Sequence, residues 1–513
     1  VQSPHPQCSI AECAGIFKMK TFHLPEGEPM RIGKALLAAA LIAPLCIKAG
    51  LLHAAATEYK FKGGYPTAET AKKAYDDADL SRAIEAYKFF YPSVSILGTW
   101  DGNIAAGTVP NKSFVLLNGR PEQVVFTPNS DTPYAGGPVD LSNGPIVVEL
   151  PPGPLISVVN DLNQRWVMDM GLPGPDGGKG GKHLILPPGY KGEIPAGYYT
   201  GTATTNRILL LFRAIPPAGD ADKAIAALKT IKVYPLNPPA GWKEVEWIDQ
   251  GRKPADFSPV RWEKGLDYWK KLHEIVDTEP AFEAYRMEYG RLATLGIEKG
   301  KPFKPDARMT AILEKAARMA NDQMRVASFA DRRADRVMWP DRKWEWATLR
   351  PENGTFDLPN YKDLDARGKW FYQAQIESPA MFGRSASAGS LYWLGTRDSK
   401  GVYLDGGKNY KLTVPQPVPG KLFWSITVYD PANRSEIVTP QNKAALRSLF
   451  ELKNKAAEKS VDLYFGPRAP AGHENEWIQT IPGKGWFTYF RIYGPEASAF
   501  DGSWKPGDFV EIK

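Results

Sequence analysis

The sequence predicts a mainly β protein with a helical insert, an α+β chain in which two antiparallel β domains are joined by a helical segment. In two regions, from about residue 124 to 216 and from 389 to 513, short apolar runs alternate with turns rich in proline and glycine. This rhythm is typical of a sandwich or a barrel. The composition agrees, because 47 glycines and 45 prolines indicate many turns between short strands.

The region ahead of the first strands predicts a helix over residues 66–92. Thr67 can cap its start, Leu80, Ile84 and Tyr87 share one apolar face, and Pro92 is expected to end it. Five strands are then expected at residues 146–150, 155–159, 166–170, 183–186 and 208–212.

Helical spacing resumes in the middle of the chain. Amphipathic helices are expected at residues 221–232, 261–276, 281–295 and 305–329. Segments rich in tryptophan and proline, at 245–257 and 337–351, are expected to be irregular. The last region then predicts strands at residues 391–394, 410–414, 421–429, 461–465, 486–493 and 509–512.

The N-terminal part has the pattern of a secretory signal. Arg31 and Lys34 form a basic region, residues 35–46 are apolar, and residues 54–56 offer a small-residue cleavage site. The apolar run is shorter than the ~20 residues of a membrane-spanning helix, and Lys48 interrupts it. A periplasmic or secreted protein, without a stable membrane anchor after cleavage, is therefore expected.

These features divide the chain into consecutive parts. The expected parts are an upstream or non-native extension at 1–29, a signal peptide at 30–56, an N-terminal helix plus β domain at 57–216, a helical linking segment at 217–384, and a C-terminal β-sandwich domain at 385–513.

Composition also excludes several classes of site. All three cysteines, Cys8, Cys13 and Cys46, precede the cleavage site, so the mature protein is expected to lack disulfides and thiol nucleophiles. The net charge of +7 falls to 59 − 54 = +5 after cleavage, without basic runs, so no nucleic-acid partner is expected. No cofactor or metal site is evident, although aspartate-rich turns could host a divalent cation such as calcium or magnesium.

Two groups of motifs resemble known families. Asn129, Asp131, Thr132 and Tyr134, followed by D-L-S at 140–142, form the signature N-x-D-T-x-Y plus D-L-S of the DUF1254 family of unknown function. The R-W-V-M-D run at 165–169 is similar to the next strand of that family.

The C-terminal region resembles a companion family, DUF1214. The motifs are L-D-G at 404–406, Tyr410, F-W-S-I-T-V-Y-D at 423–430, R-I-Y at 491–493 and D-G-S-W at 501–504. Two loops depart from the family pattern, since 475–482 reads N-E-W-I-Q-T-I-P and 459–460 reads K-S. The resemblance implies export and a jelly-roll-like or sandwich architecture, and it implies no activity.

The N-x-D-T-x-Y segment is the first candidate for chemistry. Asp131 could act as a general base, Tyr134 could polarise a substrate oxygen, and Asn129 and Thr132 could bind substrate. A turn, in which Asn and Asp side chains bond their own backbone, is the commoner role of such residues.

A second candidate is a pair of carboxylates. Arg165 and Asp169 share one face of a strand, and Asp169 could pair with Asp131 as in glycoside hydrolysis. Asp430 is the alternative acid, and an Arg165–Asp169 salt bridge is the commoner structural reading.

Aromatic residues near these acids could form a binding platform. Besides Asn129 and Thr132, the candidates for substrate binding are Arg165, Trp166, Trp424, Tyr429, Asp430, Trp477 and Arg491. The sequence thus predicts a small-molecule ligand, organic or carbohydrate-like, bound in an Asp/Tyr/Trp pocket, and acid–base hydrolysis if there is turnover. The alternative is an oligomeric protein without an active site.

Overall fold

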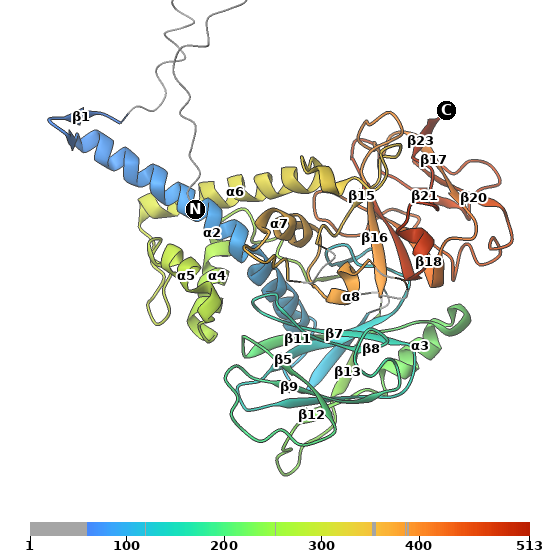
Figure 1. The fold of residues 1–513 in the computed structure, drawn as a ribbon, viewed down its shortest axis with the longest axis horizontal. Helices are drawn as coiled ribbons and strands as arrows, with labels where there is room; N and C mark the ends of the chain where they lie inside the picture. Colours follow the sequence, from blue (N-terminus) through green and yellow to red (C-terminus); the bar gives the residue numbers. More distant parts are fainter. Residues whose placement is uncertain (1–58, 118, 252, 351–354, 385, 387–388) are drawn as a thin grey trace, which may run out of the picture. The chain divides into compact units, whose positions relative to one another are not determined.

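The computed structural model describes residues 59–117, 119–251, 253–350, 355–384, 386 and 389–513 (Figure 1). The predicted extension at 1–29, the predicted signal peptide at 30–56 and all three cysteines lie outside the described residues. None of the described helices combines the length and apolar character that a bilayer span needs. Two compact units, Val1–Ala74 and Tyr75–Lys513, meet inside helix α2, Ala68–Ala105.

The described part of the first unit is a short hairpin followed by the start of α2. Strand β1, Phe61–Lys62, pairs antiparallel with β2, Tyr65–Pro66. The Thr67 hydroxyl oxygen accepts a hydrogen bond from the Thr70 backbone N–H at 3.2 Å, so Thr67 caps the helix as the sequence predicts.

Helix α2 continues through Pro92, and the prediction that it ends there is wrong. Proline inside a helix costs about 3 kcal/mol. Around it Tyr91, Val94 and Leu97 are fully buried in a core shared with helix α4, Leu266–Thr278. Because each large apolar side chain stabilises by ~1.5–3 kcal/mol when buried, packing outweighs the lost hydrogen bond.

The N-terminal β part is a sandwich whose two sheets share one core. One sheet has the order β13-β3-β5-β11-β7-β8 and the other β10-β9-β6-β12. Phe114, Val159 and Leu210 of the first sheet are buried against Ile146 and Ile185 of the second. The strands are β3 Ser113–Leu117, β5 Tyr134–Asp140, β6 Ile146–Leu150, β7 Leu155–Asp161, β8 Trp166–Gly171, β9 Gly181–Leu186, β10 Tyr198–Thr202, β11 Arg207–Ala214, β12 Lys232–Pro235 and β13 Glu246–Gly251.

Helices fill the middle of the chain, as predicted. Four of them fall in the predicted ranges with ends that differ by a few residues: α3 Ala221–Leu228, α4, α5 Arg286–Ala293 and α6 Ala307–Phe329. Two further helices, α7 Leu364–Gln373 and the short α8 Pro379–Phe382, were not predicted. Helices α2, α4 and α6 bury their apolar faces together, with Trp269, Leu313 and Ala317 fully enclosed.

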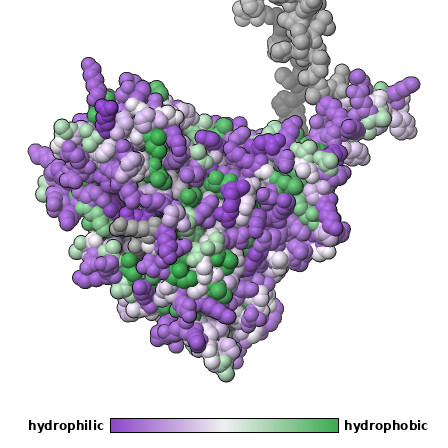
Figure 2. Space-filling model, turned by 180° about the vertical axis from the view of Figure 1, so that it is seen from behind, coloured by the Kyte–Doolittle hydropathy of each residue, from purple (hydrophilic) through white to green (hydrophobic). Residues whose placement is uncertain are grey.

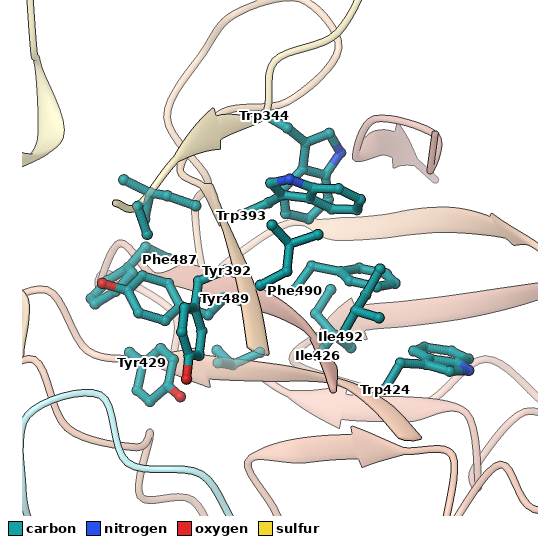
Figure 3. Packing of buried hydrophobic residues seen from close by; sticks show 14 of the residues in the cluster. Trp344, Tyr392, Trp393, Trp424, Ile426, Tyr429, Phe487, Tyr489, Phe490 and Ile492 are labelled. Atoms are coloured by element: carbon teal, nitrogen blue, oxygen red, sulfur yellow. The ribbon is translucent and has the colours of Figure 1, made fainter. Parts of the chain in front are cut away.

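The C-terminal β part is a second sandwich, with sheet orders β15-β16-β22-β18-β19 and β21-β20-β17-β23. Figure 3 shows its aromatic core, in which Trp393, Phe490 and Ile426 are buried together. The strands are β15 Glu345–Trp346, β16 Ser390–Gly395, β17 Asn409–Pro415, β18 Gly420–Tyr429, β19 Ala445–Arg447, β20 Ser460–Gly466, β21 Trp477–Gln479, β22 Phe487–Pro495 and β23 Val510–Ile512.

The predicted fold class, mainly β with a helical insert, is confirmed. Two details differ from the prediction. Segment 245–257, expected to be irregular, contains β13 and β14, Ala255–Asp256, which pair with β3 and with β4, Gln123–Val124. These two pairs, together with β9–β10 and β20–β21, are parallel, so the sheets are mixed. Parallel pairs need crossover connections, which local periodicity does not reveal.

Candidate functional site

A cavity of about 880 Å³ lies between the two β parts, both of which belong to the second unit. Strands β7, β8, β10 and β11 form one wall, and α8, β16 and the ends of β18 and β22 form the other. Most of the lining is apolar or aromatic, including Trp166, Met168, Tyr199, Leu422 and Tyr493. Its size and character are those of a small-molecule pocket.

Asp169 is the acidic side chain on the wall of this cavity. It lies on β8, and its Oδ2 accepts a hydrogen bond from the Ser378 hydroxyl at 2.8 Å. Burial raises the pKa of Asp169 to about 6, although hydrogen bonds from Ser378, Trp166 and Ala380 favour the charged form. A carboxyl group with this pKa exchanges a proton near neutral pH, which is a property of general acids and bases.

Arg213 on β11 brings a positive charge to the same cavity. Its Nε donates to the Thr132 hydroxyl at 2.9 Å and its Nη2 to the Tyr493 hydroxyl at 3.1 Å. The guanidinium also stacks over the rings of Tyr134 and Tyr493, at 4.9 and 5.4 Å from their centroids. All these partners are neutral groups.

A second, smaller hollow of about 150 Å³ adjoins the large cavity. The two share six lining residues, Leu211, Arg213, Ile376, Met381, Tyr392 and Tyr493. Asn129, Tyr134 and Arg491 line the small hollow only. The Asn129 side-chain amide donates to the Tyr493 hydroxyl, so the N-x-D-T-x-Y motif is hydrogen-bonded to the C-terminal β part.

Asp131 lies at neither of these hollows but at a third cavity of about 280 Å³, beside Arg447. Its Oδ2 accepts from the Ser425 hydroxyl at 2.7 Å. Burial raises the pKa of Asp131, against the opposite effect of the Ser425 hydrogen bond. Nearby, burial raises the pKa of Glu436 to about 7. Asp131 and Asp169 therefore occupy different cavities, and the geometry does not support the predicted pairing of the two carboxylates.

Four other predicted site residues lie away from the two adjoining hollows. Arg165 stacks over Phe282 at 5.2 Å, and no ion pair joins it to Asp169 within the described part of the chain. Trp424 stacks on Phe490 at 5.4 Å inside the core, away from Tyr429 and Tyr392 in Figure 3. The remaining two are Asp430, which pairs with Lys484 at 3.1 Å, and Trp477, whose indole donates to the Gly466 carbonyl at 2.9 Å.

Tyr429 and Arg491, also predicted to bind substrate, form one buried pair. Arg491 Nη1 donates to the Tyr429 hydroxyl at 2.5 Å, and Nη2 donates to the Thr127 carbonyl at 2.7 Å. Tyr429 in turn donates to the Pro128 carbonyl. Tyr429 thus positions Arg491, which lines the small hollow, and does not itself line it.

The residues that sequence reasoning missed are Arg213, Ser378, Tyr392 and Tyr493. Arg213 lies in β11, one residue beyond the predicted strand at 208–212, and Tyr493 lies in β22, inside the predicted strand at 486–493 and the R-I-Y motif. Strand alternation alone gives no signal that their side chains meet. The sequence contains no further motif that could have identified Arg213 or Ser378.

The glycine-rich loop at 174–181 contributes Pro175 to the cavity wall, next to Pro173. Asp176 of this loop is buried, accepts a hydrogen bond from the Gly171 N–H at 2.8 Å and lies 3.2 Å from His183 Nε2, so side-chain contacts hold the loop in place. Over the described residues, no group of three or more His, Cys, Asp or Glu side chains could hold a metal ion.

Residues 112–235 match the model of a family described as a protein of unknown function, DUF1254. Residues 389–497 match a second family with the same description, DUF1214. The resemblance to both families is confirmed. The DUF1254 segment supplies Asp169 and Arg213, and the DUF1214 segment supplies Tyr392, Arg491 and Tyr493, so the adjoining hollows are built from both.

Among solved structures, the chain is similar to the VPA0106 protein from Vibrio parahaemolyticus. The TM-score is 0.53 at 17% identity, covering 85% of this chain and 100% of that chain, which shows a shared fold. An uncharacterized protein from Burkholderia cenocepacia aligns with a TM-score of 0.39 and 11% identity, covering 86% of this chain and 97% of that chain. No curated protein matches this chain.

Proposed function

We propose that this protein binds a small organic molecule with a mainly apolar body in the 880 Å³ cavity between its two β parts. The observation that carries the proposal is the cavity itself, which is large, lined by aromatic and aliphatic side chains, and equipped with few polar groups. Pockets of ~300–1,000 Å³ with this lining hold small molecules or cofactors.

The polar groups of the cavity favour an organic ligand over a carbohydrate. A sugar needs many hydrogen-bond partners, whereas Asp169 and Ser378 already bond to each other. Ser157 also lines the cavity and, unlike Asp169 and Ser378, its buried hydroxyl has no hydrogen-bond partner among the described residues. A ligand with one or two polar atoms on an apolar frame fits this lining best.

Isothermal titration calorimetry and thermal shift test the proposal by measuring the binding of three neutral probes, indole, hydrocinnamamide and hexanamide. At least one probe is expected to bind and to raise the melting temperature by mass action. Thr200→Trp should abolish that binding, because Thr200 is exposed on β10 and lines the cavity.

The matched control is Thr202→Trp, an exposed residue two positions along the same strand that does not line the cavity. It should bind the probe like the unsubstituted protein. Binding that survives Thr200→Trp, or the failure of all probes to bind, would contradict the proposal.

A second candidate is acid–base hydrolysis of the bound molecule, favoured by the pKa of about 6 at Asp169 on the cavity wall. Asp169 would then transfer a proton to or from the ligand. The assay is turnover of para-nitrophenyl esters and glycosides across the neutral pH range. Turnover with an inflection near the pKa of Asp169, lost in Asp169→Asn, would support hydrolysis, and equal rates in the two proteins would exclude Asp169 from the reaction.

The non-catalytic oligomer, the remaining alternative, would need a large and self-complementary apolar face. The face in Figure 2 is mainly hydrophilic, and its apolar side chains form small separate groups. This face therefore lacks the large apolar surface that the alternative needs.

Export to the periplasm or the medium is part of the proposal and rests on the sequence of residues 30–56. Expression in a bacterial host, fractionation and N-terminal sequencing test it. Mature protein beginning near Thr57 outside the cytoplasm is expected, and a full-length chain retained in the cytoplasm would contradict export.

A further inference from the structure

Two arginines without carboxylate partners meet at the small hollow. Arg213 and Arg491 both line it, and in the described part of the chain neither forms an ion pair. Every hydrogen bond that they donate goes to a hydroxyl or a backbone carbonyl. Buried charges in proteins are usually paired, because removing an ion from water without compensation is costly.

The tyrosines around the two arginines do not neutralise them. Arg491 lies over the rings of Tyr392 and Tyr489, at 5.5 and 5.0 Å, in addition to its contact with Tyr429. Burial raises the pKa of Tyr489 and of Tyr493 well above the usual range of a phenol. Both hydroxyls are therefore protonated at neutral pH and supply rings and dipoles, not negative charge.

The local acids leave a positive excess. Asp131 is the acid whose charge acts on both arginines, but it lies beyond ion-pair distance and bonds to Ser425. Arg447 is already balanced by Glu451. Glu436 also acts on Arg491, but burial raises its pKa to about 7 and raises the pKa of Asp131 above its usual value, so the two acids carry less negative charge than the two guanidinium groups carry positive charge.

One donor of this group has no partner. Arg491 is 2% exposed, and its Nε–H finds no hydrogen-bond acceptor. Burying a donor of a charged group without an acceptor is unfavourable, because the group has lost its hydrogen bond to water. A negatively charged group placed in the hollow would compensate the charge of the two guanidinium groups.

The small hollow and the large cavity are continuous in their walls, with Arg213 at the shared boundary. A molecule lying in the apolar cavity can thus direct one end toward the arginines. The volume of the hollow, about 150 Å³, is many times the ~10–15 Å³ that one water needs, so the hollow has room for a carboxylate group.

We propose that Arg213 and Arg491 form the carboxylate-binding end of the ligand site, and that the ligand is an organic acid whose apolar body occupies the large cavity. This inference rests on the proposed function and narrows its ligand class. The planar carboxylate takes hydrogen bonds from guanidinium nitrogens, and the tyrosine rings exclude water from the pair.

The test compares acids with their neutral isosteres by isothermal titration calorimetry. The probes are two acid–amide pairs, hydrocinnamate with hydrocinnamamide and hexanoate with hexanamide. Each is titrated into the full-length protein at neutral pH. Each acid is expected to bind about tenfold or more tightly than its amide, a difference of ~1.4 kcal/mol or above.

Arg213→Gln should remove the preference for the acid while leaving the amide affinity within about twofold. Arg491→Gln should do the same, and Arg213→Lys should restore part of the preference because the charge is kept. The control is Arg397→Gln, which removes an arginine stacked at 3.8 Å over Tyr403 that lines neither hollow. Unliganded melting temperatures report whether each variant folds, and Arg213, which is only partly buried, serves if Arg491→Gln does not fold.

The outcomes separate the two proposals. Amides that bind as tightly as acids overturn the carboxylate inference and leave the proposed function standing. An acid preference that persists in Arg213→Gln and Arg491→Gln overturns it as well, because the charge contact then lies elsewhere. If neither acids nor amides bind, both proposals fail.

Discussion

At the scale of single residues, burial raises the pKa of several acidic side chains in this protein. Besides Asp169 and Glu436, burial raises the pKa of Glu377 to about 8. Glu377 is 3% exposed, and its Oε1 accepts a long hydrogen bond, 3.3 Å, from the Trp166 backbone N–H. No ion pair joins it to another described residue, and the neutral form is favoured because desolvation penalises the charge.

Glu377→Gln tests this at the residue scale. The folded pKa of Glu377 lies above the unfolded value of about 4.5, so its stabilising contribution is complete below pH ~4.5 and is lost as the pH rises through 8. Glutamine does not titrate, so the variant does not lose stability in this way. The free energy of unfolding of the variant minus that of the unsubstituted protein should therefore rise by several kcal/mol between pH ~4.5 and pH 8, at ~1.4 kcal/mol per pKa unit.

Urea denaturation at a series of pH values measures the difference. Glu283→Gln, at a side chain that is 84% exposed, is the control and should show no such trend. A stability difference that is independent of pH would mean that folding does not raise the pKa of Glu377.

At this scale the sequence identified part of the site. Asp169, predicted as one of a pair of carboxylates, and Trp166, predicted to bind substrate, both line the large cavity. Arg165, Trp424, Asp430 and Trp477, also predicted as site residues, lie elsewhere. Residue type indicates what a side chain can do, whereas the cavity that it faces depends on the packing of distant strands.

At the scale of elements, most strands were predictable and their pairing was not. Strand β6 has the predicted bounds, Ile146–Leu150, because its apolar run is flanked by turn residues. The parallel partners β13 and β10 depend on long crossovers and carry weak local patterns. Helix α2 extends beyond the predicted stop at Pro92 because tertiary burial outweighs a local breaker.

Gly136 shows how one strand constrains its residue type. It lies in β5 at φ +153°, and a Cβ there would meet the Leu210 carbonyl oxygen at 2.1 Å. Gly136→Ala should therefore destabilise the protein by about 3 kcal/mol or more, because the neighbouring strand β11 must shift. Chemical denaturation measures the change.

Gly144→Ala is the matched control, since Gly144 also has a positive φ, +119°, but has no atom within 4 Å of the added Cβ. The loss at Gly144 should be clearly smaller, limited to backbone strain of ~1–3 kcal/mol. Equal losses at the two positions would show that the close approach of β11 is not what excludes a side chain from position 136.

At the scale of the whole second unit, a buried ion pair ties distant segments together. Arg434 is fully buried and donates to both carboxylate oxygens of Glu263, at 3.0 and 2.6 Å. It also donates to the Tyr91 hydroxyl of α2 and to the Tyr372 carbonyl of α7. The C-terminal sandwich is thereby joined to the helical core.

Arg434→Met should destabilise the protein by about 3–5 kcal/mol, because it leaves the Glu263 carboxylate buried and unpaired. Adding Glu263→Gln should recover part of the loss. Arg308→Met is the comparison, since Arg308 pairs with Asp76 and Asp79 at the surface with a 38% exposed side chain, and should cost less than about 1 kcal/mol. If Arg434→Met were as mild as Arg308→Met, the pair would not join the two parts energetically.

The sequence predicted the two β parts, the helical insert and both family resemblances, all from patterns within single segments. It did not predict that β11 and β22 bring Arg213 and Tyr493 together, because that contact joins residues 280 positions apart in the chain. Contacts of this kind follow from the docking of two sandwiches, for which one sequence carries no local signal.

The most direct test of the ligand site is a crystal structure of the protein with para-iodobenzoate, in which anomalous scattering locates the iodine. The iodine is expected in the large cavity near Trp166 and Met168, with the carboxylate beside Arg213 and Arg491. An acid that binds with its carboxylate turned away from both arginines, or that leaves both hollows empty while bound elsewhere, would contradict the account.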